Sequence, residues 1–170
     1  MFSIEVEVKS KKWLKYKNIE KFIANTAKQL CILLPLNELK KVNFGLSISL
    51  SSNLQIKKIN HLYRGKNQAT DVLSFGNLDE VNIRQNGLKQ ALHGQQFFIL
   101  GDLILGLEYI EKHCKKNQID FNNHLTHLIL HGLLHIIGYD HEINDKEAKI
   151  MENLEIKILK KLNIKNPYLK

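Results

Sequence analysis

Histidine is concentrated in one short stretch of this 170-residue chain, and its spacing there suits metal binding. Five of the eight histidines lie in residues 124–141. His131 and His135 are four residues apart, so on a helix their side chains share a face and two imidazoles can reach one ion. Gly138 readily ends such a helix, which allows His141 to supply a third nitrogen from outside it. Three histidines leave one tetrahedral position open, the arrangement of catalytic rather than structural zinc.

The other histidines fit less specific roles. His127 lies four residues before His131, so these two form a geometrically equal pair. We prefer 131, 135 and 141 as ligands because only that set includes a helix end that brings in a ligand from a new direction. His127 is then expected behind the ligands, where it orients one of them or contacts substrate. His124 is expected to be a partly exposed helix residue. Ordinary core or surface roles are expected for the remaining three, His61, His93 and His113.

The spacing H-x3-H-x5-H with an intervening glycine also occurs in the metzincin proteases. Those enzymes carry a glutamate directly after the first histidine, and it serves as the general base. Here that position is Gly132. The missing side chain is expected to leave room beside the metal for a bulky substrate. A metallopeptidase of the metzincin type is therefore an alternative, but one that lacks its base.

Hydrophobic periodicity indicates the elements that must position these residues. Alternation predicts a strand at residues 2–8. Residues 42–50 and 71–75 are also interpreted as strands, and residues 97–105 as a buried strand. Helical spacing predicts helices at residues 18–34, 54–63, 106–116, 121–137 and 145–163. Strands alternate with helices early and helices dominate late, which favours a mixed α/β layer structure. No linker composition interrupts the chain, so residues 1–170 are interpreted as one domain. Residues 77–96 lack periodicity and are interpreted as a long loop or a ragged hairpin.

The chain carries a net charge of +8, with 25 Lys and Arg against 17 Asp and Glu. Such an excess favours a polyanionic partner. Arginine occurs only at Arg64 and Arg84, so the other 23 basic residues (25 minus 2) are lysines. A guanidinium binds phosphate through two parallel hydrogen bonds, which lysine cannot do. Arg64, at the end of a predicted helix and beside Lys66, is therefore the candidate for phosphate binding.

Two further features bear on the compartment. No run of about 18 apolar residues occurs, so no membrane span is expected. The two cysteines, Cys31 and Cys114, are too few for a disulfide framework and indicate free thiols in a reducing compartment. A cytoplasmic location without membrane contact is expected.

Several motifs resemble those of the YbeY family of bacterial metal-dependent endoribonucleases. The segment His131–His141, HGLLHIIGYDH, matches the family signature H-G-x-L-H-L-x-G-Y-D-H except that Ile136 replaces leucine. Residues 60–75 are similar to an upstream motif, N-x-x-Y-R-G-K followed by T-D-V-L-S-F-P, and residues 100–103 to L-G-D-L. A closing M-x-x-x-E element is similar to residues 151–155. Together these motifs span most of the chain.

The resemblance implies an α+β fold, a mixed β-sheet packed with helices, in which a central metal-bearing helix is followed by a C-terminal helix. It also implies one zinc ion per chain on three ligands, His131, His135 and His141. Arg64 is implied to be essential for RNA cleavage, and Lys66 is expected to bind substrate with it. His127 and Asp140 are expected to support the ligands from behind. Gly76 departs from the family pattern, which has proline at this position.

The activity that the resemblance implies is zinc-dependent, single-strand-specific cleavage of RNA in late ribosomal RNA processing. It includes 3′-end maturation of small-subunit rRNA and ribosome quality control. The expected partners are single-stranded or ribosomal RNA, the small ribosomal subunit and other rRNA-processing factors, with no specificity for DNA. An alternative is a zinc-containing RNA-binding factor of ribosome assembly that does not cleave RNA. The open fourth coordination position argues against it.

Overall fold

The structure is a computed structural model that describes residues 1–34, 36, 42–78, 90 and 92–169. Its strands are β1 (Phe2–Val8), β2 (Asn43–Ser51), β3 (Val72–Gly76) and β4 (Phe97–Gly106). Its helices are η1 (Lys11–Lys15), α1 (Ile19–Leu33), α2 (Asn53–Arg64), α4 (Leu107–Asn117), α5 (Phe121–Ile136) and α6 (Asp145–Lys161). Within the described ranges, every helix is too short or too polar to span a membrane.

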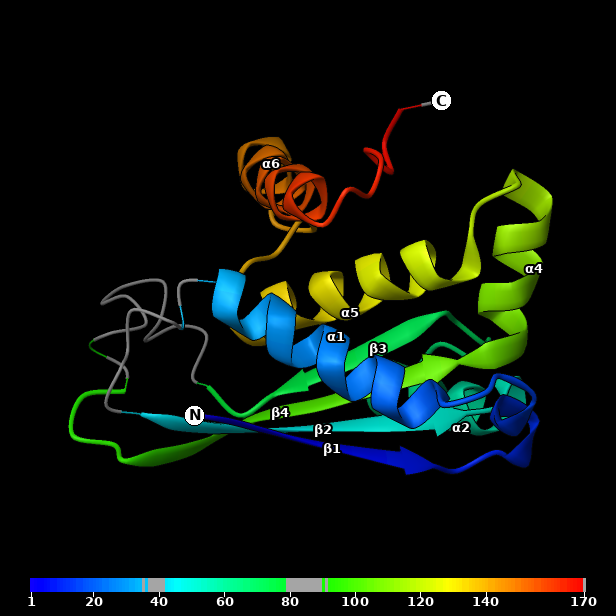
Figure 1. Ribbon diagram of the computed structural model, residues 1–170, viewed down its shortest axis with the longest axis horizontal. Helices are drawn as coiled ribbons and strands as arrows, with labels where there is room; N and C mark the ends of the chain where they lie inside the picture. Colours follow the sequence, from blue (N-terminus) through cyan, green and yellow to red (C-terminus); the bar gives the residue numbers. More distant parts are fainter. Residues whose placement is uncertain (35, 37–41, 79–89, 91, 170) are drawn as a thin grey trace.

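The described strands form one mixed sheet in the order β1-β2-β4-β3. β1 pairs with β2 and β2 with β4 in parallel, whereas β3 runs antiparallel to β4. Figure 1 shows α1 and α5 side by side over one face of this sheet, and α6 stacked beyond α5. Helix α6 thus lies farther from the sheet than α1 and α5, and α5 is enclosed between the sheet and α6.

The two faces of β4 explain how α5 and α2 come to lie on opposite sides. Successive side chains of a strand point to opposite faces. Leu103 packs into the main core beneath α5, whereas its neighbour Ile104 joins Ile56 of α2 and Leu73 of β3 in a second, smaller cluster. The sheet therefore buries apolar side chains on both faces where β3 and β4 meet. This is the part of the sheet that lies next to the histidine-bearing helix.

The α+β fold that the family resemblance implies is confirmed. Each predicted strand and helix is present, with its bounds shifted by at most two residues. The short helix η1 was not predicted. It holds the fully buried Trp13, whose indole N–H donates to the carbonyl of Ser51 at 2.9 Å. One buried anchor produces no periodicity, so hydrophobic patterning cannot reveal it. Of the predicted loop 77–96, residues 79–89 and 91 lie outside the described residues.

Candidate metal centre

Helix α5 ends at the reversal that the glycine was expected to allow. Gly138 has a φ of 97°, in the region that favours glycine. Its N–H donates to the carbonyl of His135 at 3.0 Å, and the N–H of Tyr139 donates to the carbonyl of Leu134 at 3.0 Å. These two bonds form a Schellman motif, which satisfies the last carbonyls of the helix and turns the chain. The turn carries His141 back toward the helix.

Three imidazoles meet at this reversal. The ring centroids of His131, His135 and His141 lie 4.7, 5.0 and 5.1 Å apart, which is nearly an equilateral triangle. One ligand atom of each residue lies within 4.8 Å of the other two. The structure therefore brings together the three histidines that the sequence singled out, in an arrangement that could hold one metal ion.

A cavity of about 350 Å³ opens beside the three histidines. Strand β3 and Arg64 form other parts of its wall. The donors are all imidazoles, a ligand type that suits zinc. Three such donors beside an open space fit a zinc ion that keeps one coordination position for water or substrate.

Arg64 reaches this cavity from the end of α2. The helix stops at Gly65, whose φ is 68° and whose N–H donates to the carbonyl of His61 at 3.0 Å. The Arg64 Nη2 atom lies 3.6 Å from Oε1 of Glu142, and the two side chains are 45% and 61% exposed. Such an exposed ion pair is weak, so an anionic ligand can displace it. Lys66 is exposed and is not among the residues that line the cavity.

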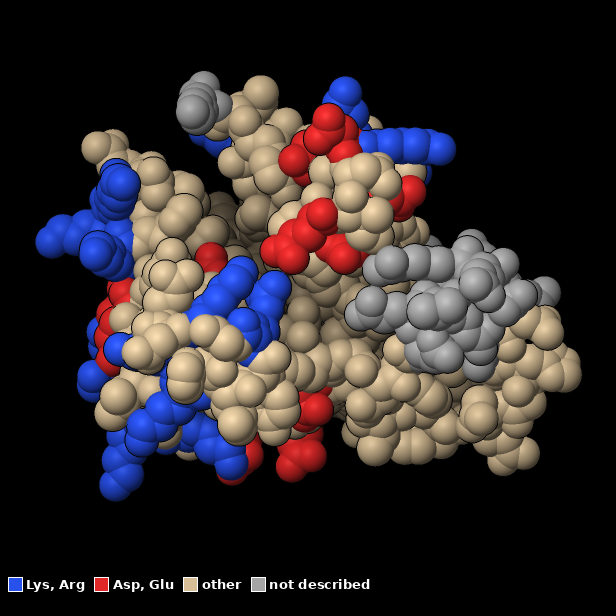
Figure 2. Space-filling view, turned by 180° about the vertical axis from the view of Figure 1, so that it is seen from behind, with Lys and Arg blue, Asp and Glu red and all other residues tan. Residues whose placement is uncertain are grey.

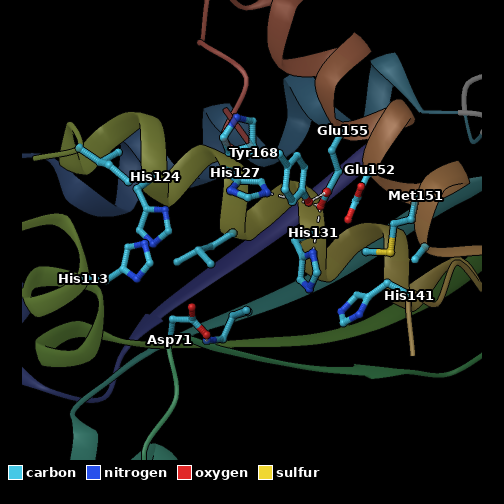
Figure 3. Close-up of a pocket in the computed structure, with 15 residues that line it drawn as sticks. Asp71, His113, His124, His127, His131, His141, Met151, Glu152, Glu155 and Tyr168 are labelled. Atoms are coloured by element: carbon cyan, nitrogen blue, oxygen red, sulfur yellow. Dashed lines mark hydrogen bonds and ion pairs between the residues drawn. The ribbon is translucent and has the colours of Figure 1, made fainter. Parts of the chain in front are cut away.

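Glu155 of α6 is the residue of the site that sequence reasoning did not select. Its side chain is fully buried, and one carboxylate oxygen lies 2.9 Å from Nδ1 of His131 (Figure 3). The other oxygen accepts a hydrogen bond from the hydroxyl of Tyr168. Two signals were available: the match to the closing M-x-x-x-E element, and the place of Glu155 on the buried face of α6 beside Met151 and Ile158. A carboxylate on an apolar helix face needs a partner.

The electrostatics of these groups favour metal binding. Burial alone would raise the pKa of Glu155, but the two nearby histidines and the Tyr168 hydroxyl outweigh it and lower the pKa to about 2. Glu155 is therefore an ionised acceptor at neutral pH, and His131 donates its Nδ1 hydrogen to it. This leaves the lone pair of Nε2 for an ion. Burial, followed by the charges of His131 and His141, lowers the pKa of His135 to about 4 and keeps its imidazole neutral.

The two residues expected behind the ligands lie near the three histidines. Nε2 of His127 is 3.6 Å from the Glu155 oxygen that contacts His131, which is beyond hydrogen-bond distance. His127, His131 and Glu155 form a second group of ligand atoms within 4.8 Å of one another. Asp140 accepts a hydrogen bond from the N–H of Glu142 at 2.8 Å and so shapes the turn that holds His141. The supporting roles of His127 and Asp140 stay predictions.

Comparisons with known proteins identify the family. The family model for Endoribonuclease YbeY matches residues 5–163. The Endoribonuclease YbeY of Ehrlichia ruminantium strain Gardel is 38% identical over 168 residues, which are 97% of this chain and 94% of the relative. The chain belongs to the YbeY family. The Bartonella henselae member is 36% identical over 169 residues, 99% of this chain and 98% of the relative. The Ruthia magnifica member is 39% identical over 133 residues, which are 78% of this chain and 83% of the relative.

A solved structure shares the fold. The solution structure of TM1509 from Thermotoga maritima matches with a TM-score of 0.59 and covers 99% of this chain and 100% of that one. The two sequences are 22% identical. At this identity the likeness supports the fold alone.

Gly132 has a different role in this YbeY family member from the one expected. A Cβ atom at Gly132 would lie 2.5 Å from Cδ2 of Leu103, so the position faces the sheet. The prediction that its missing side chain leaves room for substrate is wrong. The glycine instead lets α5 pack closely on β4. A glutamate here would collide with Leu103, so this position cannot provide the base of a metzincin.

The expectation that His124 is partly exposed is also wrong. His124 is only 8% exposed, because its ring stacks on that of His113 at a centroid distance of 4.5 Å and an interplanar angle of 7°. Burial, and then the charges of His113 and His127, lower the pKa of His124 to about 4, against a weaker opposing effect of Asp71. His124 is therefore neutral at physiological pH. Since α4 supplies the covering ring, local helix periodicity could not predict this burial.

The shifted pKa of His124 predicts acid sensitivity of the metal-free protein. The unfolded chain takes up a proton at His124 near pH 6.5, whereas the folded protein does so only near pH 4. The free energy of unfolding should therefore fall as the pH drops through this window, by on the order of 2–3 kcal/mol from this residue. Thermal unfolding of the wild type and of His124→Gln at several pH values checks it. The variant should lose less stability, and parallel curves would contradict the prediction.

The lysines of the N-terminal edge are partly neutralised. Three of them form ion pairs with glutamates: Lys9 with Glu7, Lys12 with Glu108 and Lys15 with Glu111. Figure 2 shows that Lys and Arg side chains gather at the end of the molecule where α2 and α4 lie, and that the surface is hollowed beside them. On this face, many of the positive side chains therefore lie at the same end of the molecule as the helix that carries Arg64.

Proposed function

We propose that the chain is a zinc-dependent, single-strand-specific endoribonuclease of late ribosomal RNA processing. The observation that carries the proposal is the shared cavity, which is lined by the three histidines and by Arg64. Cleavage of RNA requires stabilisation of the charge that develops on the phosphate oxygens, and a metal ion with an arginine can supply it. The relatives carry the name Endoribonuclease YbeY, which supports this activity for the chain.

The residues of the site have different roles in cleavage. Zinc held by the three histidines would polarise a phosphoryl oxygen and lower the pKa of a water molecule toward about 7. Arg64 exchanges its exposed pair with Glu142 for two non-bridging phosphate oxygens, and its contacts strengthen as negative charge builds there. Glu155 holds the hydrogen of His131 on Nδ1 and so fixes the orientation of the ring. Lys66, exposed beside Arg64, is assigned to a more distant phosphate.

The biological setting of the proposal is the ribosome. We assign the enzyme to 3′-end maturation of small-subunit rRNA and to ribosome quality control in the cytoplasm, with the small subunit and other rRNA-processing factors as partners. The net charge of +8 supports a polyanionic substrate. Binding that depends on lysine contacts to phosphates should weaken steeply as salt concentration rises.

The deciding experiment couples metal analysis to an RNA cleavage assay with purified protein. We expect one zinc ion per chain, cleavage of single-stranded but not duplex RNA, loss of cleavage on chelation and its return with added zinc. A zinc-containing protein that binds RNA and leaves it intact would instead be the ribosome-assembly factor. Hydrolysis of a denatured protein would favour the metallopeptidase.

Replacing Glu155 with glutamine should weaken zinc binding about 10-fold or more while the protein stays folded. The amide can still accept the hydrogen of His131, but it lacks the negative charge that makes the imidazole a better ligand. Competition with a zinc chelator of known affinity measures the change. Glu147→Gln, in the first turn of the same helix, is the matched control. Equal zinc affinity in the two variants would show that Glu155 serves packing alone.

A further inference from the structure

A second cavity, of about 490 Å³, continues from the metal centre along α5. It shares His131, His141 and Asp71 with the first cavity, so the two adjoin. Figure 3 shows His131 and His141 at one end of this groove and His113 and His124 at the other. His124 lies seven residues from His131, which is about 10 Å along the helix axis. The groove therefore extends away from the proposed position of the scissile phosphate.

The walls of this groove are mostly rings and apolar side chains. At the far end, His113 and His124 are stacked in parallel at 4.5 Å. On another side, the ring of Tyr168 meets that of His127 edge to face at 5.8 Å and 82°, and the Tyr168 hydroxyl is held by Glu155. Ring faces and edges line the groove, and such surfaces suit a planar ligand. Proteins bind unstacked RNA bases against the same kinds of side chain.

Two buried polar atoms also point to a ligand with hydrogen-bonding edges. Nε2 of His124 and Nε2 of His127 are buried and have no hydrogen-bond partner among the described residues. His124 is more than nine-tenths buried and lines the groove. Leaving such a group without a partner costs free energy, which a ligand recovers when it supplies one. Because His124 is neutral, it suits the edge of a base better than a phosphate.

We propose that this groove binds the base of a nucleotide next to the scissile phosphate, with the base inserted toward the rings of His113 and His124. The proposal rests on the proposed function, since it takes RNA as the ligand. A base can enter only after leaving its helical stack. The groove therefore gives a physical reason for selectivity toward single strands, because a base paired in a duplex cannot reach it.

Binding of short RNAs to the metal-free protein tests the groove without requiring cleavage. The probes are five-nucleotide RNAs that carry one abasic nucleotide at each position in turn. In the wild type, removing the base at one of the five positions should weaken RNA binding about 10-fold or more. In His113→Ala and His124→Gln the same removal should change binding less than 3-fold. His93→Ala, an exposed histidine outside both cavities, is the control and should behave like the wild type.

The outcomes separate the groove from the proposed function. His113 is only half-buried, so His113→Ala is expected to stay folded. This variant still tests the groove if thermal unfolding shows that His124→Gln is destabilised. An equal effect of base removal in the wild type and His113→Ala overturns the proposal, as does the absence of measurable binding. The zinc-loaded protein is then given the same intact RNA. Base-dependent binding without cleavage would leave the groove in place and refute the nuclease function.

Discussion

His131→Ala should lose both its zinc and its RNA cleavage, with the rate falling about 10³-fold or more. Removing one of three imidazoles leaves two donors, too few for a site that keeps a catalytic ion. The metal is expected to contribute several kcal/mol of charge stabilisation, and each 1.36 kcal/mol changes a rate tenfold. Metal analysis and a single-strand cleavage assay on the same preparation measure both losses.

Two further variants separate the alternative ligand pairs. His135→Ala should behave like His131→Ala, because both rings belong to the triangle with His141. His127→Ala should keep its zinc, because Nε2 of His127 points to the Glu155 side of His131. Loss of zinc from His127→Ala and its retention by His135→Ala would reverse the assignment. A His131→Ala protein that cleaves RNA at the wild-type rate would refute a catalytic metal.

Arg64→Ala should reduce cleavage about 10²–10³-fold and leave zinc content and thermal stability unchanged. A fall in rate of this size is typical when an enzyme loses one preorganised hydrogen-bond donor to a developing oxyanion. Stability should not change, because the side chain is 45% exposed and its ion pair with Glu142 is 3.6 Å long. Single-turnover cleavage rates, zinc analysis and thermal unfolding together test the three parts of this prediction.

Two other variants serve as controls for Arg64→Ala. Arg64→Lys keeps a positive charge but not the planar fork, so it should recover only part of the lost rate. Arg84, the other arginine of the sequence, offers Arg84→Ala as a variant that removes the same charge elsewhere. If Arg64→Ala cleaved RNA as fast as Arg84→Ala, the assignment of Arg64 to the phosphate would be wrong.

Local sequence determined a large part of this protein. Hydrophobic patterning predicted the strands and all the described helices except η1 to within two residues. The interval from His131 to His135, followed by Gly138, predicted a helix end that returns His141 to the pair, and the Schellman motif forms there. These features are predictable because they depend on contacts within a few residues, where chain geometry alone sets the distances.

Only the tertiary structure decided which distant residues complete the site. Arg64 joins the histidines because α2 and α5 lie on opposite faces of β3 and β4 and both end near the same cavity. Glu155 meets His131 because α6 packs on α5, and His113 of α4 buries His124. Gly132 faces Leu103 rather than the substrate. Periodicity shows that a helix has a buried face, but it does not show which element covers that face. That choice depends on how the whole core packs.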